Sequence, residues 1–215
     1  MVSRMRSIWR LCEAGRQPGR DVKRWPMVAA GAALVVALLA GQFALRAPAP
    51  SDIGGPFRLV DQTGAPADER LLRGKWSAVF FGYTYCPDVC PTTLANLGQA
   101  EVALGDRAGR FQVVFITVDP QRDTPAALRS YLASPTFPKA TIGLTGDAGQ
   151  IAAVARAYHV YYQRVPQGDT YTMDHSAVVY LMDPKGRFVA PLDVGAPPPG
   201  VARQIRAAMD GGRPA

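Results

Sequence analysis

Cysteine and histidine are scarce in this chain of 215 residues, which has 3 Cys and 2 His. So few cysteines exclude a small secreted fold held together by many disulfides. Charged residues are also few, at 19%, while hydrophobic residues make up 48%, which excludes an intrinsically disordered or collagen-like chain. Length and composition together indicate one folded domain with an appendage.

The excess of positive charge is confined to the N-terminus. The chain has 24 basic and 17 acidic residues, a net charge of +7. Residues 1–46 alone hold eight basic and two acidic residues, and therefore carry +6 of this charge. The remainder is nearly neutral, so it lacks the basic surface with which nucleic-acid-binding proteins neutralise phosphates. We therefore expect no nucleic-acid partner.

A single long apolar run follows the basic segment. Residues 27–45 are apolar except for Gln42, and as a helix they would span roughly 28 Å, about one bilayer core, which excludes a polytopic transporter. Seven basic residues precede the run and only Arg46 follows it closely, so the positive-inside rule predicts a cytoplasmic N-terminus. A signal peptide cleaved at Ala47-Pro48-Ala49 is the alternative, but the run is longer than the apolar core of about 7–15 residues in such peptides.

These features predict four segments: a basic cytoplasmic N-terminus (1–25), a transmembrane helix (26–46), a Pro- and Gly-rich linker (47–56) and an extracytoplasmic domain (57–215). The prediction describes a single-pass protein of the inner (cytoplasmic) membrane whose C-terminal domain lies in the periplasm.

Strand-like and helix-like segments alternate in the C-terminal domain. Strand-like runs occur at 57–60, 75–83, 111–118, 141–144, 176–182 and 187–192. Helical patterns occur at 92–104, 124–133, 147–158 and 201–209. The early alternation indicates parallel crossovers, whereas the turn at 183–186 indicates a final antiparallel hairpin. This order predicts an α/β thioredoxin-like fold with a central mixed sheet flanked by helices.

The C-terminal domain has one C-x-x-x-C pair, Cys86 and Cys90, while Cys12 precedes the apolar run. Such a pair can be a structural disulfide, a redox couple or two metal ligands, but a disulfide across so short a ring would constrain little of the unfolded chain. The pair follows the strand-like run 75–83 at its C-terminal end, where open α/β sheets bind ligands. We expect the pair on an exposed loop, with Cys90 near a helix N-cap that stabilises its thiolate.

The two histidines differ in their expected positions. His159 follows the helical segment 147–158 and is expected to be a packed or surface residue. His175 precedes the strand-like run 176–182, and if that strand is antiparallel to the earlier ones, His175 lies at the sheet edge that carries the cysteines. Two thiolates and one imidazole suit copper, Cu(I) above all, or zinc, and the lack of a fourth protein ligand favours copper.

Other side chains near this edge have simpler interpretations. Met173 is better explained as filler than as a copper ligand. Asp119 is better explained as the cap of the loop before Pro120 than as a hydrogen-bond acceptor beside a metal site or a weak Cu(II) ligand. Asp174 is expected in a turn and Asp88 in solvent.

Three motifs, YTYCPDVCPTTL, VDPQRDTP and DHSAVVYLMDPKGRF, resemble the Sco/SenC family of membrane-anchored copper proteins in their order and separation. The resemblance covers about residues 57–209. It implies copper binding, as Cu(I) or Cu(II), through Cys86, Cys90 and His175. It also implies a metallochaperone, rather than an enzyme, that delivers copper to the dinuclear copper centre of cytochrome c oxidase. The implied partners are the copper-bearing subunit of that oxidase, another periplasmic copper chaperone as donor, and a thiol reductase.

A thiol-disulfide oxidoreductase that keeps the cysteines of an acceptor protein reduced is the alternative function. One cysteine would attack a disulfide of the partner, and the other would resolve the mixed disulfide. The C-x-x-x-C spacing and the histidine at position 175, where such enzymes have a proline, favour the metallochaperone. A peroxidase has less support, since no arginine-supported peroxide pocket is evident. Because a Cys86–Cys90 disulfide would abolish soft copper binding, the redox state could gate the chaperone.

Overall fold

The structure, a computed structural model, describes residues 53–212. The predicted N-terminal segment (1–25), transmembrane helix (26–46) and most of the linker (47–52) lie outside the described residues. Within 53–212, none of the helices combines the length and the apolar character needed to cross a bilayer.

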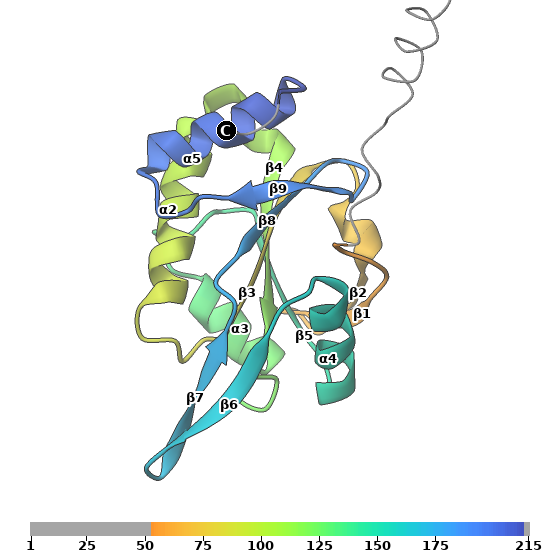
Figure 1. Cartoon of the computed structure of the whole chain (residues 1–215), viewed down its shortest axis with the longest axis vertical. Coiled ribbons are helices and arrows are strands. Elements are labelled where there is room, and N and C mark those ends of the chain that lie inside the picture. Colours follow the sequence, from red (N-terminus) through yellow and green to blue (C-terminus); the bar gives the residue numbers. More distant parts are fainter. Residues whose placement is uncertain (1–52, 213–215) are drawn as a thin grey trace, which may run out of the picture. The chain divides into compact units, whose positions relative to one another are not determined.

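A seven-stranded mixed sheet forms the centre of the domain (Figure 1). Its strands are β1 (Arg58–Asp61), β2 (Pro66–Asp68), β3 (Trp76–Gly82), β4 (Phe111–Thr117), β5 (Thr141–Thr145), β8 (Val179–Met182) and β9 (Phe188–Leu192). They are arranged in the order β2-β1-β5-β4-β3-β8-β9. Strands β3, β4 and β5 are parallel, whereas β1, β2, β8 and β9 pair antiparallel with their neighbours. The predicted mixed sheet is therefore confirmed.

Helices cover both faces of this sheet. They are α2 (Val89–Ala103), α3 (Pro125–Leu132), α4 (Ala148–Ala157) and α5 (Pro198–Met209), with the 3-10 turns η1 (Glu69–Leu72) and η2 (Gly105–Arg110). Helix α2 packs against α5, and Figure 1 shows this pair on one side and α4 on the other. Sequence signals fix two helix starts, because Thr124 caps α3 and Asp147 forms a capping box with Gln150 at the start of α4.

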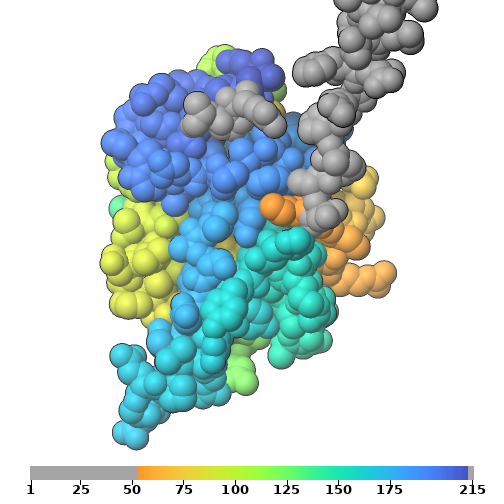
Figure 2. Space-filling model, in the orientation of Figure 1, coloured from red at the N-terminus to blue at the C-terminus, as the bar shows by residue number. Residues whose placement is uncertain are grey.

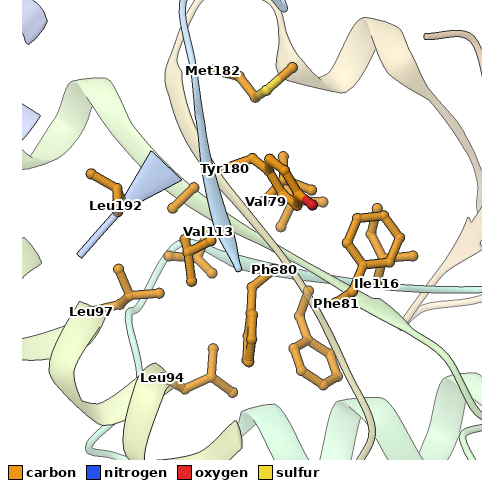
Figure 3. Packing of buried hydrophobic residues seen from close by; sticks show 14 of the residues in the cluster. Val79, Phe80, Phe81, Leu94, Leu97, Val113, Ile116, Tyr180, Met182 and Leu192 are labelled. Carbon is orange, nitrogen blue, oxygen red and sulfur yellow. The ribbon is translucent and has the colours of Figure 1, made fainter. Parts of the chain in front are cut away.

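The core lies along β3 and β4, whose residues are all buried, as expected for parallel strands covered on both faces. Successive residues of β3 point to opposite helix layers. Phe80 packs edge-to-face on Phe115, with ring centroids 5.8 Å apart, and Figure 3 shows it on the side of Leu94 from α2. Phe81 instead contacts Tyr158, which follows α4, at 5.3 Å. This packing holds the sheet rigid beneath its edge loops.

A two-stranded ribbon projects from this body (Figure 2) and forms a separate sheet. It consists of β6 (Tyr162–Gln167) and β7 (Thr170–His175), paired antiparallel from Tyr162 opposite His175 to Gln167 opposite Thr170. The sequence did not predict this ribbon, because β6 is largely exposed, contains Pro166 and lacks apolar alternation. The strand predicted at 176–182 is also shorter than expected, since β8 starts at Val179 and His175 belongs to β7.

Strand pairing brings three chain segments to one edge of the sheet. In the parallel β3–β4 pair, Gly82 lies opposite Thr117, so both strands end together. Strand β8 runs antiparallel to β3 with Val179 opposite Phe80, so it begins near that edge. The sequence argument for the position of His175 depended on this antiparallel pairing, which the structure confirms.

Candidate metal centre

Cys86, Cys90 and His175 converge at this edge. One ligand atom from each residue lies within 4.8 Å of the other two, and His175 Nε2 is 3.7 Å from Cys90 Sγ. Cys86 and Cys90 are both free thiols. Among the described residues, this group of clustered ligand-type side chains includes no carboxylate. The structure therefore brings together the three residues that the sequence singled out.

The cysteine arm runs from the end of β3 into α2. A turn from Tyr83 to Cys86 starts it, with the Cys86 N–H donating to the Tyr83 carbonyl at 3.2 Å. The Cys90 N–H then points at Cys86 Sγ, at 3.4 Å. This bond keeps the two sulfurs on the same side of the loop.

The prediction that Cys90 lies on an exposed loop was wrong. Helix α2 starts at Val89, so Cys90 and Pro91 belong to its first turn, and Cys90 is fully buried. The first hydrogen bond of this helix runs from the Thr92 N–H to the Asp88 carbonyl. Pro91 therefore occupies a position that needs no N–H donor, which is why the helix can begin before it.

Gly82 makes room for the buried thiol. A Cβ at position 82 would lie 2.8 Å from Cys90 Sγ and 2.8 Å from Cε2 of Phe115, closer than real Cβ contacts. Cys90 Sγ thus rests directly on the last residue of β3. Only glycine allows the thiol to pack this close to the strand.

Burial raises the pKa of the Cys90 thiol well above its ordinary value, and the adjacent Cys86 adds to the effect. The expectation that the helix N-terminus stabilises a Cys90 thiolate was therefore wrong. Desolvation penalises the charged form more than the backbone hydrogen bond from Tyr83 favours it. In the metal-free protein Cys90 is a protonated thiol at neutral pH, while Cys86 remains partly exposed.

The second arm of the site, the histidine arm, is strand β7, which ends at His175. The His175 imidazole is half-buried and has a defined orientation. His175 Nδ1 lies 3.1 Å from the Ser176 carbonyl oxygen, which can only accept, so Nδ1 carries the proton. The lone pair of Nε2 then faces Cys90 Sγ. Burial lowers the pKa of His175, although the Ser176 bond opposes this shift, so the imidazole is available as a neutral ligand.

Tyr83 ties the ribbon to the main sheet. Its ring meets that of His175 edge-on, with centroids 5.8 Å apart and an interplanar angle of 88°. Its hydroxyl shares a 2.8 Å hydrogen bond with Oγ1 of Thr172. One residue of the cysteine arm therefore contacts β7 at two places.

The loop between β4 and α3 contacts both arms. Asp119 forms an ion pair with Arg122 and accepts a 2.9 Å hydrogen bond from the Tyr171 hydroxyl. Asp123, fully buried, accepts hydrogen bonds from Thr84 N–H (3.0 Å), Thr84 Oγ1 (2.6 Å) and Thr117 Oγ1 (2.6 Å). Burial raises the pKa of Asp123 in spite of these donors.

The remaining candidate residues lie outside the clustered ligand atoms. The carboxylate of Asp119 pairs with Arg122 and accepts from Tyr171, so it acts as a hydrogen-bond acceptor beside the site rather than as the expected loop cap. Asp174 is exposed within strand β7, paired opposite Gln163, so its expected place in a turn was wrong. Met173 is buried, at 8% exposure. His159 is exposed after α4 at a positive φ of 55°, as a surface residue.

Sequence reasoning missed the roles of Tyr83, Arg122, Asp123 and Tyr171 around the site. The run VDPQRDTP, with three charged side chains after a fully buried strand, was a usable signal, because charges at a strand end need partners. Tyr171 gave no such signal, since its partners are distant in sequence.

A thioredoxin-like α/β sheet with two free cysteines and a histidine at its carboxyl edge defines a class of proteins that bind soft metals or exchange disulfides. Comparison with known proteins specifies the class further. The SCO1/SenC family model matches residues 46–210. Protein SenC of Rhodobacter capsulatus is 43% identical over 165 residues, which cover 75% of this chain and 73% of SenC. The chain belongs to the SCO1/SenC family.

Mitochondrial and bacterial relatives extend this comparison. Protein SCO1 homolog 1 of Arabidopsis thaliana is 42% identical over 160 residues, 72% of this chain and 47% of the relative. The chain thus spans about half the length of this relative, as it does for SCO1 and SCO2 of Saccharomyces cerevisiae. The copper-bound structure of ScoI from Bradyrhizobium japonicum matches with a TM-score of 0.67 at 46% identity, over 72% of this chain and 98% of ScoI. Copper-bound ScoI of Arabidopsis thaliana matches with a TM-score of 0.69 at 37% identity, over 74% of this chain and 99% of that ScoI chain.

Proposed function

We propose that this chain is a membrane-tethered copper metallochaperone. It binds copper through Cys86, Cys90 and His175 and delivers it for assembly of the dinuclear copper centre of cytochrome c oxidase. The convergence of three soft ligand atoms within 4.8 Å carries the proposal. The copper-bound structures of two relatives support it.

The donor set fits copper better than zinc. Two thiolates suit Cu(I), and the imidazole adds a ligand that Cu(II) favours. Structural zinc prefers four protein ligands, whereas the cluster in the described part of the chain offers three. Copper is the cargo of this site, so a set that lacks a fourth protein ligand leaves a position for the ligand of an acceptor.

Unequal exposure of the two sulfurs supports transfer by ligand exchange. Cys86 is partly exposed, whereas Cys90 is buried. An incoming thiolate can therefore reach copper from the side of Cys86 while Cys90 still holds it. The copper-bearing subunit of the oxidase is the proposed acceptor, and another periplasmic copper chaperone is the proposed donor.

The apolar run at 27–45 supports anchoring in the inner membrane. With a cytoplasmic N-terminus, the site faces the periplasm, an oxidising compartment where free thiols need a reductant. A thiol reductase is therefore a further proposed partner.

The test is a titration of the reduced full-length chain with Cu(I) and with Cu(II), with thiols counted before and after. We expect one equivalent of copper, protection of two thiols, and loss of tight binding in Cys86→Ala and Cys90→Ala. Cys12→Ser is the matched control and should bind normally. Stoichiometric binding retained in both site variants would refute the proposed site.

The two histidines provide a second comparison. His175→Ala should weaken Cu(II) binding more than Cu(I) binding, because two thiolates alone can hold the monovalent ion. His159→Ala should bind both ions as the wild type does. Equal losses of the two ions in His175→Ala would argue against its assignment as a ligand.

A thiol-disulfide oxidoreductase is the second candidate, favoured by two free, adjacent thiols of which one is accessible. The Cys86 thiolate would attack a partner disulfide and release one partner thiolate. The Cys90 sulfur would then lose its proton, attack Cys86 and release the second thiolate, so that the partner is reduced and the pair oxidised. Ready cycling against a glutathione buffer, without any copper binding, would favour this function.

A further inference from the structure

His175, a proposed copper ligand, lies on the β6–β7 ribbon. The position of this ribbon depends on contacts with the seven-stranded sheet and its connecting loops, called the body below. A two-stranded antiparallel ribbon is marginally stable on its own in water. Strands β6 and β7 pair only with each other and are separate from the main sheet. The distance between the imidazole and the sulfurs is therefore set by contacts from outside the ribbon.

Arg122 and Asp119 hold the ribbon at Tyr171, four residues before His175. Arg122 Nη1 donates to the Tyr171 carbonyl oxygen at 3.1 Å, and its guanidinium lies 3.8 Å from the centre of the Tyr171 ring. Asp119 accepts from the hydroxyl of the same tyrosine at 2.9 Å and pairs with Arg122. The backbone carbonyl, the ring and the hydroxyl of Tyr171 thus all contact Arg122 or Asp119.

The same guanidinium contacts the cysteine arm. It lies 4.6 Å from the ring centre of Tyr85, which directly precedes Cys86, and 5.8 Å from that of Tyr83. The side chains of Arg122 and Asp119 are only 18% and 4% exposed, so solvent screens their interaction weakly. Arg122 therefore bridges the two arms of the site.

We propose that the Arg122–Asp119 pair is a clamp that positions His175 against the cysteines and thereby sets the affinity for Cu(II) but not for Cu(I). This inference rests on the proposed copper function. Without the clamp the ribbon keeps the contacts of Tyr83 with Thr172 and His175 but loses its hold at Tyr171, so it moves more and the imidazole spends less time near the sulfurs. Cu(I) is held by two thiolates whose places are set by local hydrogen bonds, from the Cys86 N–H to the Tyr83 carbonyl and from the Cys90 N–H to Cys86 Sγ, whereas Cu(II) needs the imidazole.

Arg164 provides a matched control. Its guanidinium also lies over the Tyr171 ring, at 3.7 Å. However, Arg164 is an exposed residue of β6, so this contact stays within the ribbon. Loss of Arg164 removes a cation–π contact of similar geometry without breaking a connection to the body.

The experiment compares full-length Arg122→Met and Arg164→Met with the wild type in Cu(II) and Cu(I) competition titrations. Groups that orient metal ligands commonly change metal affinity by about 10–100-fold. We expect a Cu(II) loss of that size in Arg122→Met, Cu(I) affinity within about twofold of the wild type, and no change in Arg164→Met.

Hydrogen exchange of the metal-free proteins gives a readout that needs no copper. Arg122→Met should lose protection at the amides of β6 and β7 and keep it in β3 and β4, which also shows that the variant folds. Unchanged Cu(II) affinity, an equal loss of both ions, or a ribbon as protected as in the wild type would overturn the clamp. A wild-type chain that binds neither ion would instead overturn the proposed function.

Discussion

His175 presents Nε2 to Cys90 Sγ at 3.7 Å because its Nδ1 is held by the Ser176 carbonyl oxygen at 3.1 Å. The neutral imidazole is thus oriented before any metal arrives. A protonated imidazole at this place would turn a second N–H toward the sulfurs and could not bind copper.

The first prediction concerns pH and the stability of the metal-free protein. Burial lowers the pKa of His175 below its ordinary value of 6.5. At a pH between the lowered pKa of the folded state and 6.5, the unfolded chain binds a proton at His175 that the folded chain does not. The contribution of the neutral His175 to the free energy of unfolding is therefore complete above pH 6.5 and declines as the pH falls below it. Urea unfolding at about pH 7.5 and about pH 5.5 should show a larger loss in the wild type than in His175→Gln. Equal losses would show that His175 does not contribute.

The second prediction concerns the reactivity of the two thiols. Cys86 is partly exposed, whereas Cys90 is buried and burial raises its pKa. Iodoacetamide should therefore modify Cys86 at least about tenfold faster than Cys90 in the reduced, metal-free protein. Mass spectrometry of the Cys12→Ser variant measures both rates without interference from the third thiol. Faster modification of Cys90 would contradict the burial described here.

The third prediction concerns proton release on copper binding. Because its raised pKa keeps Cys90 protonated at neutral pH, copper must displace that proton when it binds the sulfur. The apparent Cu(I) affinity should fall about tenfold per pH unit for each displaced proton as the pH is lowered from about 8 to about 6. Competition titrations across this range measure the slope. A slope near zero would mean that copper does not bind the Cys90 sulfur.

The fourth prediction concerns Gly82. In Gly82→Ala the new methyl group would meet Cys90 Sγ and Phe115 at 2.8 Å, so the sulfur must move away from the sheet. We expect Cu(I) affinity to fall about tenfold or more, since both thiolates hold that ion. Gly109→Ala is the control, because a Cβ there has no neighbour within 4 Å. A normal Cu(I) affinity in Gly82→Ala would show that the site tolerates the displacement.

The fifth prediction concerns Asp123, which accepts three hydrogen bonds from Thr84 and Thr117. Asp123→Asn replaces one accepting oxygen with an NH2 donor, which opposes these donors in a buried place. The free energy of unfolding should fall by about 1–3 kcal/mol. The exposed Asp88→Asn should stay within about 0.5 kcal/mol of the wild type. Urea denaturation of both variants measures these free energies of unfolding. Equal values for the two variants would contradict the role given to Asp123.

The position of the site could be predicted because it depends on strand direction alone. Parallel strands end at one edge, and an antiparallel neighbour begins there, so the chain order of Cys86, Cys90 and His175 sufficed to place them together. The burial of Cys90 could not be predicted, since it depends on the absence of a side chain at Gly82 and on a helix that starts before Pro91.

The ribbon and its clamp were beyond sequence reasoning for a different reason. Strand β6 has no apolar alternation, and its partner β7 carries a single buried residue, Met173. Such strands form because the contacts around Tyr171 hold them, and those contacts join residues about 50 positions apart. Propensity and periodicity describe only neighbours along the chain.

The separation of 85 residues between Cys90 and His175 also sets an order of events during biogenesis. The thiols leave the ribosome, and cross the membrane if the domain is exported, well before the imidazole follows. Strand β8 must then pair with β3 to bring the ribbon to its edge, a long-range contact that forms late because closing so large a loop is entropically costly. The three side chains therefore come together only in a chain that has finished folding, so copper bound by all three would be confined to mature molecules.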